Sequence, residues 1–160
     1  MKQSLHVITL CLFMLATVSS GTLKAAETRP NVVFFLLDDL GWKDLGCYGS
    51  SFYETPNIDQ FAKESVKFTQ AYATCHVCSP TRASIMTGKY PARLDMTDWL
   101  SGRRDFPFQQ LLNAEIHQYL PLSEVTIAEA LKAAGYQTAH IGKWHLAEEP
   151  HGPTAQGFDL

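Results

Sequence analysis

The chain has 160 residues, of which 46% are hydrophobic, and a formal net charge of −3 from 13 basic and 16 acidic residues. This length fits one domain and is too short for two substantial ones. The hydrophobic content excludes wholesale disorder, and the absence of any basic run argues against binding to nucleic-acid phosphates. Four cysteines are too few for a disulfide scaffold.

Residues 1–25 predict a secretory signal peptide. Lys2 precedes a mostly apolar run over residues 5–18, and Ala25-Ala26 offers a cleavage point. The run is too short for a membrane span, so an uncleaved anchor is the weaker alternative. Three cysteines would remain after cleavage, and an odd number in an exported protein leaves at least one thiol unpaired, modified or bound elsewhere.

The pattern of apolar residues that follows predicts an α/β domain. Residues 31–37 form a continuous apolar run, which is typical of a strand buried on both faces of a parallel sheet. Thr55-Pro56 then opens a short helix that extends to residue 65. Residues 66–73 alternate weakly and indicate a short strand.

A second helix is predicted from Cys78 to residue 87, with Pro80 in its first turn and Gly88 as its C-terminal cap. Thr126-Ile-Ala-Glu129 has the form of a capping box and predicts a third helix, which stops at Gly135. Residues 136–141 predict a strand after it. Strand, helix and strand in this order favour an α/β layered domain.

Two adjacent carboxylates, Asp38 and Asp39, follow the predicted strand at the end where open α/β sheets bind ligands. Such oxygen ligands favour Ca²⁺ or Mg²⁺, although a solvated strand end or a helix cap explains the pair equally well. Cys75 and Cys78 have the spacing of a redox pair, but no thioredoxin-like pattern surrounds them and no second ligand pair completes a zinc site.

Cationic residues are predicted to surround Cys78. Cys78 lies at a helix N-terminus, Arg82 follows one turn later, and Lys143 and His145 come from the end of the strand predicted over residues 136–141. Together they suit a tetrahedral oxyanion, either sulfate or phosphate.

Three motifs resemble the sulfatase family of the alkaline-phosphatase superfamily. Cys78-Ser-Pro-Thr-Arg82 followed by Gly88 resembles its Cys-x-Pro-x-Arg signature, and Gly135-Tyr-Gln-Thr-Ala-His-Ile-Gly-Lys-Trp-His145 resembles a second signature. The stretch from Arg29-Pro-Asn-Val to Asp38-Asp39-Leu-Gly is a third match, in the same order. The resemblance covers residues 29–160 and is greatest to bacterial enzymes of the arylsulfatase A and N-acetylgalactosamine-6-sulfatase type.

The resemblance implies a sulfuric ester hydrolase in which Cys78 is oxidised to formylglycine, whose hydrate attacks sulfur and later expels sulfate. Asp38, Asp39 and the modified Cys78 would hold a Ca²⁺ ion. The remaining residues would act on the substrate and the hydrate: Arg82 would stabilise the hydrate, Lys143 would bind a sulfate oxygen, and His145 would position or deprotonate a hydroxyl. The implied partners are an aryl or carbohydrate sulfate and a formylglycine-generating enzyme.

The implied fold is the N-terminal part of a mixed or parallel sheet sandwich with helices on both faces. Family members are several times longer, and their remaining metal ligands and a further His and Lys lie downstream, so we expect residues 29–160 to be a truncated part of a catalytic domain. The alternatives are a phosphonate or phosphate ester hydrolase of the same superfamily and a non-catalytic truncated product. Residues 94–119 are the expected local contributor to specificity.

Periplasmic or extracellular location in a bacterium is the expectation for the exported chain. Asn31, Asn57 and Asn113 each lack a Ser or Thr two residues on, so none is a glycosylation acceptor, as a lysosomal relative would carry. No membrane span is expected once the signal peptide is cleaved.

Overall fold

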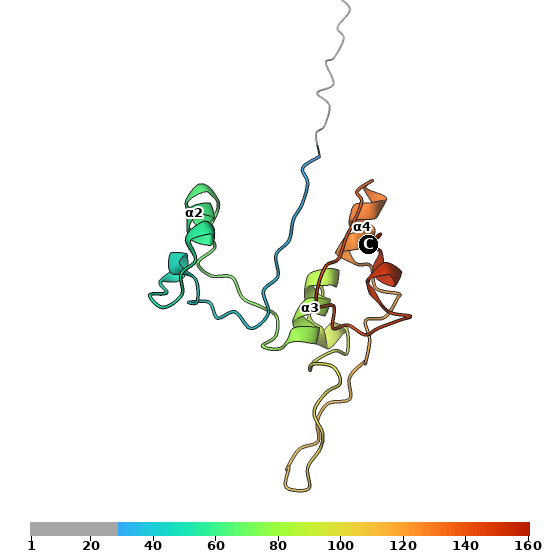
Figure 1. The fold of residues 1–160 in the computed structure, drawn as a ribbon. Coiled ribbons are helices and arrows are strands. Elements are labelled where there is room, and N and C mark those ends of the chain that lie inside the picture. The colour runs from blue at the N-terminus through green and yellow to red at the C-terminus, as the bar shows by residue number, and fades with distance from the viewer. Residues whose placement is uncertain (1–28) are drawn as a thin grey trace, which may run out of the picture. The chain divides into compact units, whose positions relative to one another are not determined.

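The computed structural model describes residues 29–160, and the predicted signal peptide over residues 1–25 lies outside the described residues. The described residues divide into two units, residues 29–37 and residues 38–160. Within them the helices are Pro56–Glu64 (α2), Cys78–Thr87 (α3) and Ile127–Ala133 (α4), and the 3-10 turns are Gly46–Tyr48 (η1), Pro91–Arg93 (η2) and Pro153–Gln156 (η3) (Figure 1).

The three predicted helices are confirmed, with boundaries that follow the expected signals. Pro56 occupies the first turn of α2. Helix α3 begins at Cys78 and ends at Thr87, and its C-cap is Gly88, whose φ of 70° is the left-handed conformation that glycine adopts without strain. The N-terminus of α4 is a complete capping box: the Glu129 amide donates to the Thr126 hydroxyl at 3.2 Å, and the Thr126 amide donates to the Glu129 carboxylate at 2.7 Å.

The predicted sheet is not formed by residues 29–160. A strand requires a ladder of main-chain hydrogen bonds to a neighbour, and residues 31–37 have none within the described part of the chain. Their side chains are exposed, from 38% at Leu36 to 82% at Phe35, so the double burial expected of this run is also missing. Residues 66–73 likewise form no strand.

The segment predicted as the last strand, residues 136–141, is paired only briefly. The His140 amide donates to the Leu160 carbonyl at 2.8 Å, and the Leu160 amide donates to the Thr138 carbonyl at 3.3 Å. This is the pattern of a single parallel bridge, which is too short to make a strand. The side chain of Asp159 extends the contact, because it accepts from the Thr138 amide at 2.9 Å.

A small hydrophobic core holds α3 against the C-terminal half of the chain. Helix α3 packs on α4 and on η2, and Figure 1 shows α3 and α4 side by side. The buried apolar side chains come from four separate segments, with Met86 and Phe158 packed at the edge. They are Ala83, Leu94, Met96, Leu120, Trp144 and Leu146.

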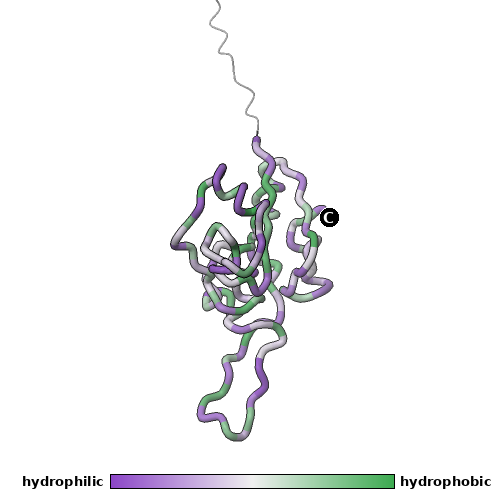
Figure 2. Tube along the Cα trace, turned by 60° about the vertical axis from the view of Figure 1, so that its left-hand side comes forward, coloured by the Kyte–Doolittle hydropathy of each residue, from purple (hydrophilic) through white to green (hydrophobic). Residues whose placement is uncertain are grey.

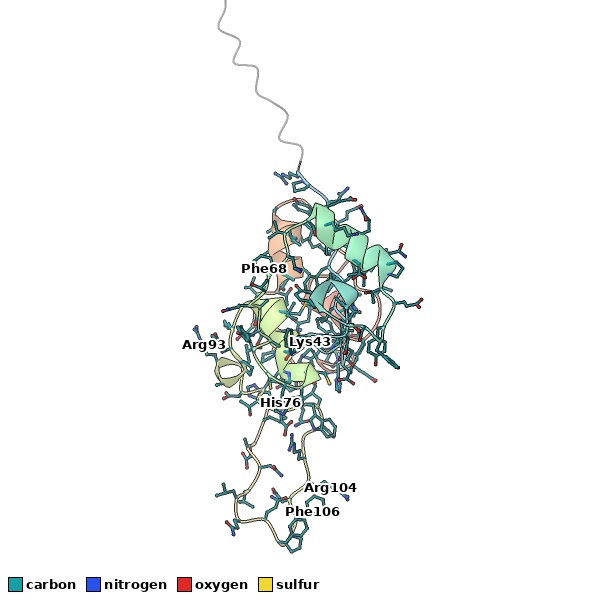
Figure 3. The ribbon with its side chains drawn as sticks, turned by 90° about the vertical axis from the view of Figure 1, so that its left-hand side faces the viewer. Lys43, Phe68, His76, Arg93, Arg104 and Phe106 are labelled. Carbon is teal, nitrogen blue, oxygen red and sulfur yellow. The ribbon has the colours of Figure 1, made fainter. Side chains whose placement is uncertain are left out.

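A long loop, defined here as the 99–113 loop, leaves this core and returns to it (Figure 1). Figure 3 shows Arg104 and Phe106 far out on it, and Figure 2 shows both hydrophobic and hydrophilic stretches along it. Asn113 ties its two arms by donating to the Asp105 carboxylate at 3.0 Å from the main chain and 2.9 Å from the side chain. No helix within residues 29–160 is long and apolar enough to cross a membrane.

Candidate functional site

Cys78 lies in the first turn of α3 and is partly buried. No side chain caps this helix N-terminus, so its free amide groups leave a positive potential near Cys78. The preceding turn is fixed by Thr81, whose hydroxyl donates to the Cys75 carbonyl at 2.8 Å. Cys75 and Cys78 are both free thiols, so the structure contains no bridge between them.

Asp38, Arg82 and Lys143 are brought together although they are far apart in the sequence. The Arg82 guanidinium lies 3.4 Å from one carboxylate oxygen of Asp38, and the Lys143 ammonium bonds to the other. Arg82 also donates to the main-chain carbonyl of Lys143. The Arg82 side chain is 9% exposed, whereas those of Asp38 and Lys143 are 38% and 41% exposed. A buried guanidinium therefore anchors a partly exposed ion pair.

The charges of this cluster shift one another's titration. The hydrogen bond from Lys143, and secondarily the one from Arg82, hold the pKa of Asp38 below its ordinary value against the opposing effect of burial. The hydrogen bond to Asp38 raises the pKa of Lys143, and the neighbouring Cys78 raises it further. Lys143 therefore lies close to Cys78 as well as to Asp38.

His145 is held by the main chain at the start of the 99–113 loop. Its Nε2 lies 2.9 Å from the carbonyl oxygen of Leu100. Its other ring nitrogen, Nδ1, is buried and has no hydrogen-bond partner within the described residues. The backbone of His145 is in the left-handed region at φ 55°, a conformation that costs energy in a non-glycine residue and is frequent at functional sites.

Asp39 is exposed, has φ 57° and lies outside the Asp38–Arg82–Lys143 cluster. No group of three or more His, Cys, Asp or Glu side chains in residues 29–160 is placed to hold a metal ion. Calcium takes six to eight oxygen ligands, and both carboxylate oxygens of Asp38 already bond to cations. The described residues therefore do not fit a calcium site by themselves.

Two polar atoms of the site are buried without a partner in the described part of the chain: Arg82 Nε and His145 Nδ1. Buried polar atoms without partners are rare in folded proteins. Arg82 Nε can only donate a hydrogen bond, whereas a neutral imidazole can accept one. A hydroxyl group can satisfy either atom, since it both donates and accepts.

Sequence reasoning missed the role of Ser79. It is fully buried in α3, and its hydroxyl accepts from the Leu100 amide at 3.0 Å. The signal was available, because Ser79 lies inside the Cys78–Arg82 motif, but nothing in the sequence pairs it with Leu100.

The family model for sulfatases matches residues 30–160. The chain belongs to the sulfatase family. Human steryl-sulfatase is 45% identical over 129 residues, which cover 81% of this chain and 21% of the relative. Human arylsulfatase A is 42% identical over 137 residues, which cover 84% of this chain and 25% of the relative. The chain thus spans about a quarter or less of these relatives.

Two solved structures also match this chain. The crystal structure of Ps i-CgsB matches with a TM-score of 0.64 at 36% identity and covers 76% of this chain and 25% of that one. A structure solved in complex with its substrate D-glucosamine-2-N,6-O-disulfate matches with a TM-score of 0.65 at 37% identity, covering 82% of this chain and 22% of that one. These matches show that residues 29–160 share a fold with the matched structures, while the predicted sheet is not formed by residues 29–160.

Proposed function

We propose that this chain carries the nucleophile-bearing part of a sulfuric ester hydrolase, with Cys78 as the residue converted to formylglycine. The observation that carries the proposal is the cationic cluster beside Cys78 in a member of the sulfatase family. Arg82 follows Cys78 by one helical turn, and Lys143 lies close enough for Cys78 to raise its pKa. A formylglycine hydrate supplies the oxygen nucleophile that attacks the sulfur of the ester.

In this proposal Arg82 and Lys143 bind and neutralise oxyanions. Negative charge grows on the sulfate oxygens during displacement, and fixed cations in a partly buried site stabilise it. Lys143 is the more exposed of the two and binds a sulfate oxygen. The buried Arg82, with its unpartnered Nε, holds a hydroxyl of the hydrate.

His145 takes or positions a hydroxyl proton of the hydrate. Its buried Nδ1 has no partner in residues 29–160 and can accept a hydrogen bond in the neutral ring.

In this proposal the chain supplies only some of the ligands of a calcium ion. Asp38 and Asp39, with the modified Cys78, supply too few oxygens for the six to eight that Ca²⁺ takes, so we derive no step through the ion. The expected result is weak or absent calcium binding by this chain in calorimetry. Tight binding lost on Asp39→Ala would show that residues of this chain complete the site.

The proposed substrate is an aryl or carbohydrate sulfate, and the proposed maturation partner is a formylglycine-generating enzyme in an exported, periplasmic or extracellular bacterial setting. The substrate of the neighbour solved with D-glucosamine-2-N,6-O-disulfate is a carbohydrate sulfate, which favours that class. Residues 94–119 are the proposed local contributor to specificity, because the 99–113 loop within them contains Leu100, whose carbonyl contacts His145.

The test is to co-express the chain with a formylglycine-generating enzyme and to map the peptide that carries both Cys75 and Cys78 by mass spectrometry. We expect conversion of Cys78 and not of Cys75, because only Cys78 has Pro80 and Arg82 at the motif offsets. Cys75→Ala should leave the conversion intact, and Cys78→Ala should abolish it. An unmodified Cys78, under conditions that convert a control sulfatase, contradicts the proposal.

The reaction class is tested on paired aryl sulfate and aryl phosphate esters with the converted chain. Hydrolysis of the sulfate that is lost in Cys78→Ala supports a sulfatase. Preference for the phosphate ester would instead assign the alternative activity of the same superfamily.

A further inference from the structure

Ser79, Leu100 and His145 form a relay of two hydrogen bonds that passes through one residue. The Leu100 amide donates to the Ser79 hydroxyl at 3.0 Å, and the Leu100 carbonyl lies 2.9 Å from His145 Nε2. Leu100 is thus fixed at both ends of its backbone, by helix α3 on one side and by His145 on the other.

This geometry settles which nitrogen of His145 carries the proton. A carbonyl oxygen can only accept a hydrogen bond, so Nε2 must be the protonated nitrogen of the neutral ring. Nδ1 is then the nitrogen with the free lone pair. It is also the buried nitrogen that lacks a partner in the described residues.

Ser79 is well placed to hold this arrangement. Its side chain is inaccessible to solvent and sits one residue after Cys78 in the first turn of α3. The 99–113 loop, which contains Leu100, extends away from the core (Figure 1), so without the Ser79 contact Leu100 loses one of its two side-chain anchors. Buried polar contacts of this kind fix the orientation and the tautomer of a neighbouring histidine.

We propose that Ser79 is a positioning residue, which holds Leu100 so that its carbonyl fixes the Nε2-protonated tautomer of His145 and leaves Nδ1 as the proton acceptor. The assignment of Nδ1 as the acceptor for a hydroxyl proton rests on the proposed function. The tautomer and its dependence on Ser79 do not.

The experiment is proton and nitrogen NMR of the His145 ring in the full 160-residue chain, at a pH high enough that its ring signals no longer change with pH. His145→Asn assigns the signals among the six histidines. In the unsubstituted chain we expect a protonated Nε2, a bare Nδ1 and a slowly exchanging Nε2 proton. Ser79→Ala should accelerate exchange of that proton about fivefold or more, as expected for a lost hydrogen bond.

Ser84→Ala is the matched control. Ser84 lies on the same helix, is also buried, and has a hydroxyl without a partner in the described residues. The same substitution there should leave the His145 ring signals unchanged. An equal response in the two variants, or no response in Ser79→Ala, overturns the proposal.

A second pair of variants distinguishes the loss of the Ser79 hydroxyl from a change in packing around residue 79. Ser79→Thr and Ser79→Val introduce nearly equal volume, and only the first retains a hydroxyl. Slow exchange in the threonine variant with fast exchange in the valine variant supports the relay, and equal exchange in both overturns it. Failure of Cys78 conversion in the maturation experiment contradicts the proposed function without changing these ring signals, so the two failures are distinguishable.

Discussion

Helices α2 and α3 have nearly the same length, of 9 and 10 residues, yet they are held in different ways. Helix α3 buries five residues and packs on α4 and η2. Helix α2 buries none and contacts the turn η1. Isolated helices this short are marginal in water, so α3 owes its stability to tertiary burial and α2 depends on local polar contacts.

The polar contacts of α2 converge on one carboxylate. Asp59 accepts from the Cys47 amide at 2.6 Å and from the Thr55 hydroxyl at 3.0 Å, and that hydroxyl accepts from the Gly46 amide at 2.8 Å. Phe61, on the same helix, is 70% exposed. Two of the candidate site residues, Cys78 and Arg82, belong to the buried helix α3, which gives them a well-packed support.

The largest expected effect is a cavity in the core beside α3. Leu120 is fully buried, so Leu120→Ala should lower the free energy of unfolding by about 3 kcal/mol, through lost apolar burial and an unfilled cavity. Denaturant titration followed by circular dichroism measures this loss.

The matched substitution on α2 is Ile58→Ala. Ile58 is 40% exposed, so the loss there should stay below about 1 kcal/mol. Equal losses of unfolding free energy at the two sites would show that burial stabilises α2 as much as it stabilises α3, and would contradict the difference between the two helices.

The next effect concerns the close approach of Gly157 to the N-terminus of α4. Gly157 has φ 96°, and a Cβ atom there would lie 2.7 Å from the Glu129 amide nitrogen. Gly157→Ala therefore combines a strained backbone with a main-chain clash, and should cost about 2–3 kcal/mol in unfolding free energy.

Gly88→Ala separates the two causes. Gly88 also has a positive φ, of 70°, but open space surrounds its Cβ position, so only the backbone strain of about 1 kcal/mol remains. A cost at Gly157 no larger than at Gly88 would contradict the close packing of the chain end against α4.

The sequence predicted the helices better than the sheet for a physical reason. The signals for α2, α3 and α4 are local: Pro56, Gly88 and the Thr126–Glu129 capping box act within one or two turns. A strand depends on a partner distant in sequence, and residues 31–37 have none in the described part of the chain. Local patterns therefore gave the helix boundaries, whereas the pairing of His140 with Leu160 had no local signal.

In the candidate site, too, local motifs were predictable from the sequence and contacts between distant residues were not. The motifs predicted the cationic residues around Cys78, and the structure brings Arg82 and Lys143 together. They did not predict that Asp38 pairs with both cations, because a side-chain contact across 105 residues leaves no trace in a single sequence. The proposed roles of these residues in catalysis remain predictions for the experiments above.

A smaller effect is expected on the polar support of α2. Asp59→Ala removes the acceptor for Cys47 and Thr55 and should destabilise η1 and α2 by about 1 kcal/mol. Hydrogen exchange of the Cys47 amide should then be about fivefold faster, while the amides of α3 keep their protection. Glu64→Ala, at the exposed end of α2, is the control and should leave Cys47 unchanged. Simultaneous loss of protection in α3 would mean that the two helices unfold as one unit.

The smallest expected effect is electrostatic and concerns α4, the helix on which α3 packs. Lys132, in the last turn of α4, lies 2.5 Å from the Asp159 carboxylate. This contact, and secondarily the hydrogen bond from the Thr138 amide, lower the pKa of Asp159. A lowered pKa in the folded state means that the carboxylate stabilises the fold above its unfolded pKa of about 3.9, and that this contribution disappears as the pH falls through the folded pKa.

Lys132→Met should raise the pKa of Asp159 only part of the way to its ordinary value, because the Thr138 hydrogen bond remains. The acid-induced loss of its contribution still begins near the unfolded pKa, but it is complete at a higher pH, and the contribution itself is smaller. Carbon NMR titration of the Asp159 carboxyl measures the shift directly. Lys63, in the last turn of α2, forms no ion pair within residues 29–160, so Lys63→Met should leave the titration unchanged. An unchanged pKa in Lys132→Met would show that solvent screens the α4 ion pair completely, leaving the Thr138 amide as the group that holds Asp159 in place.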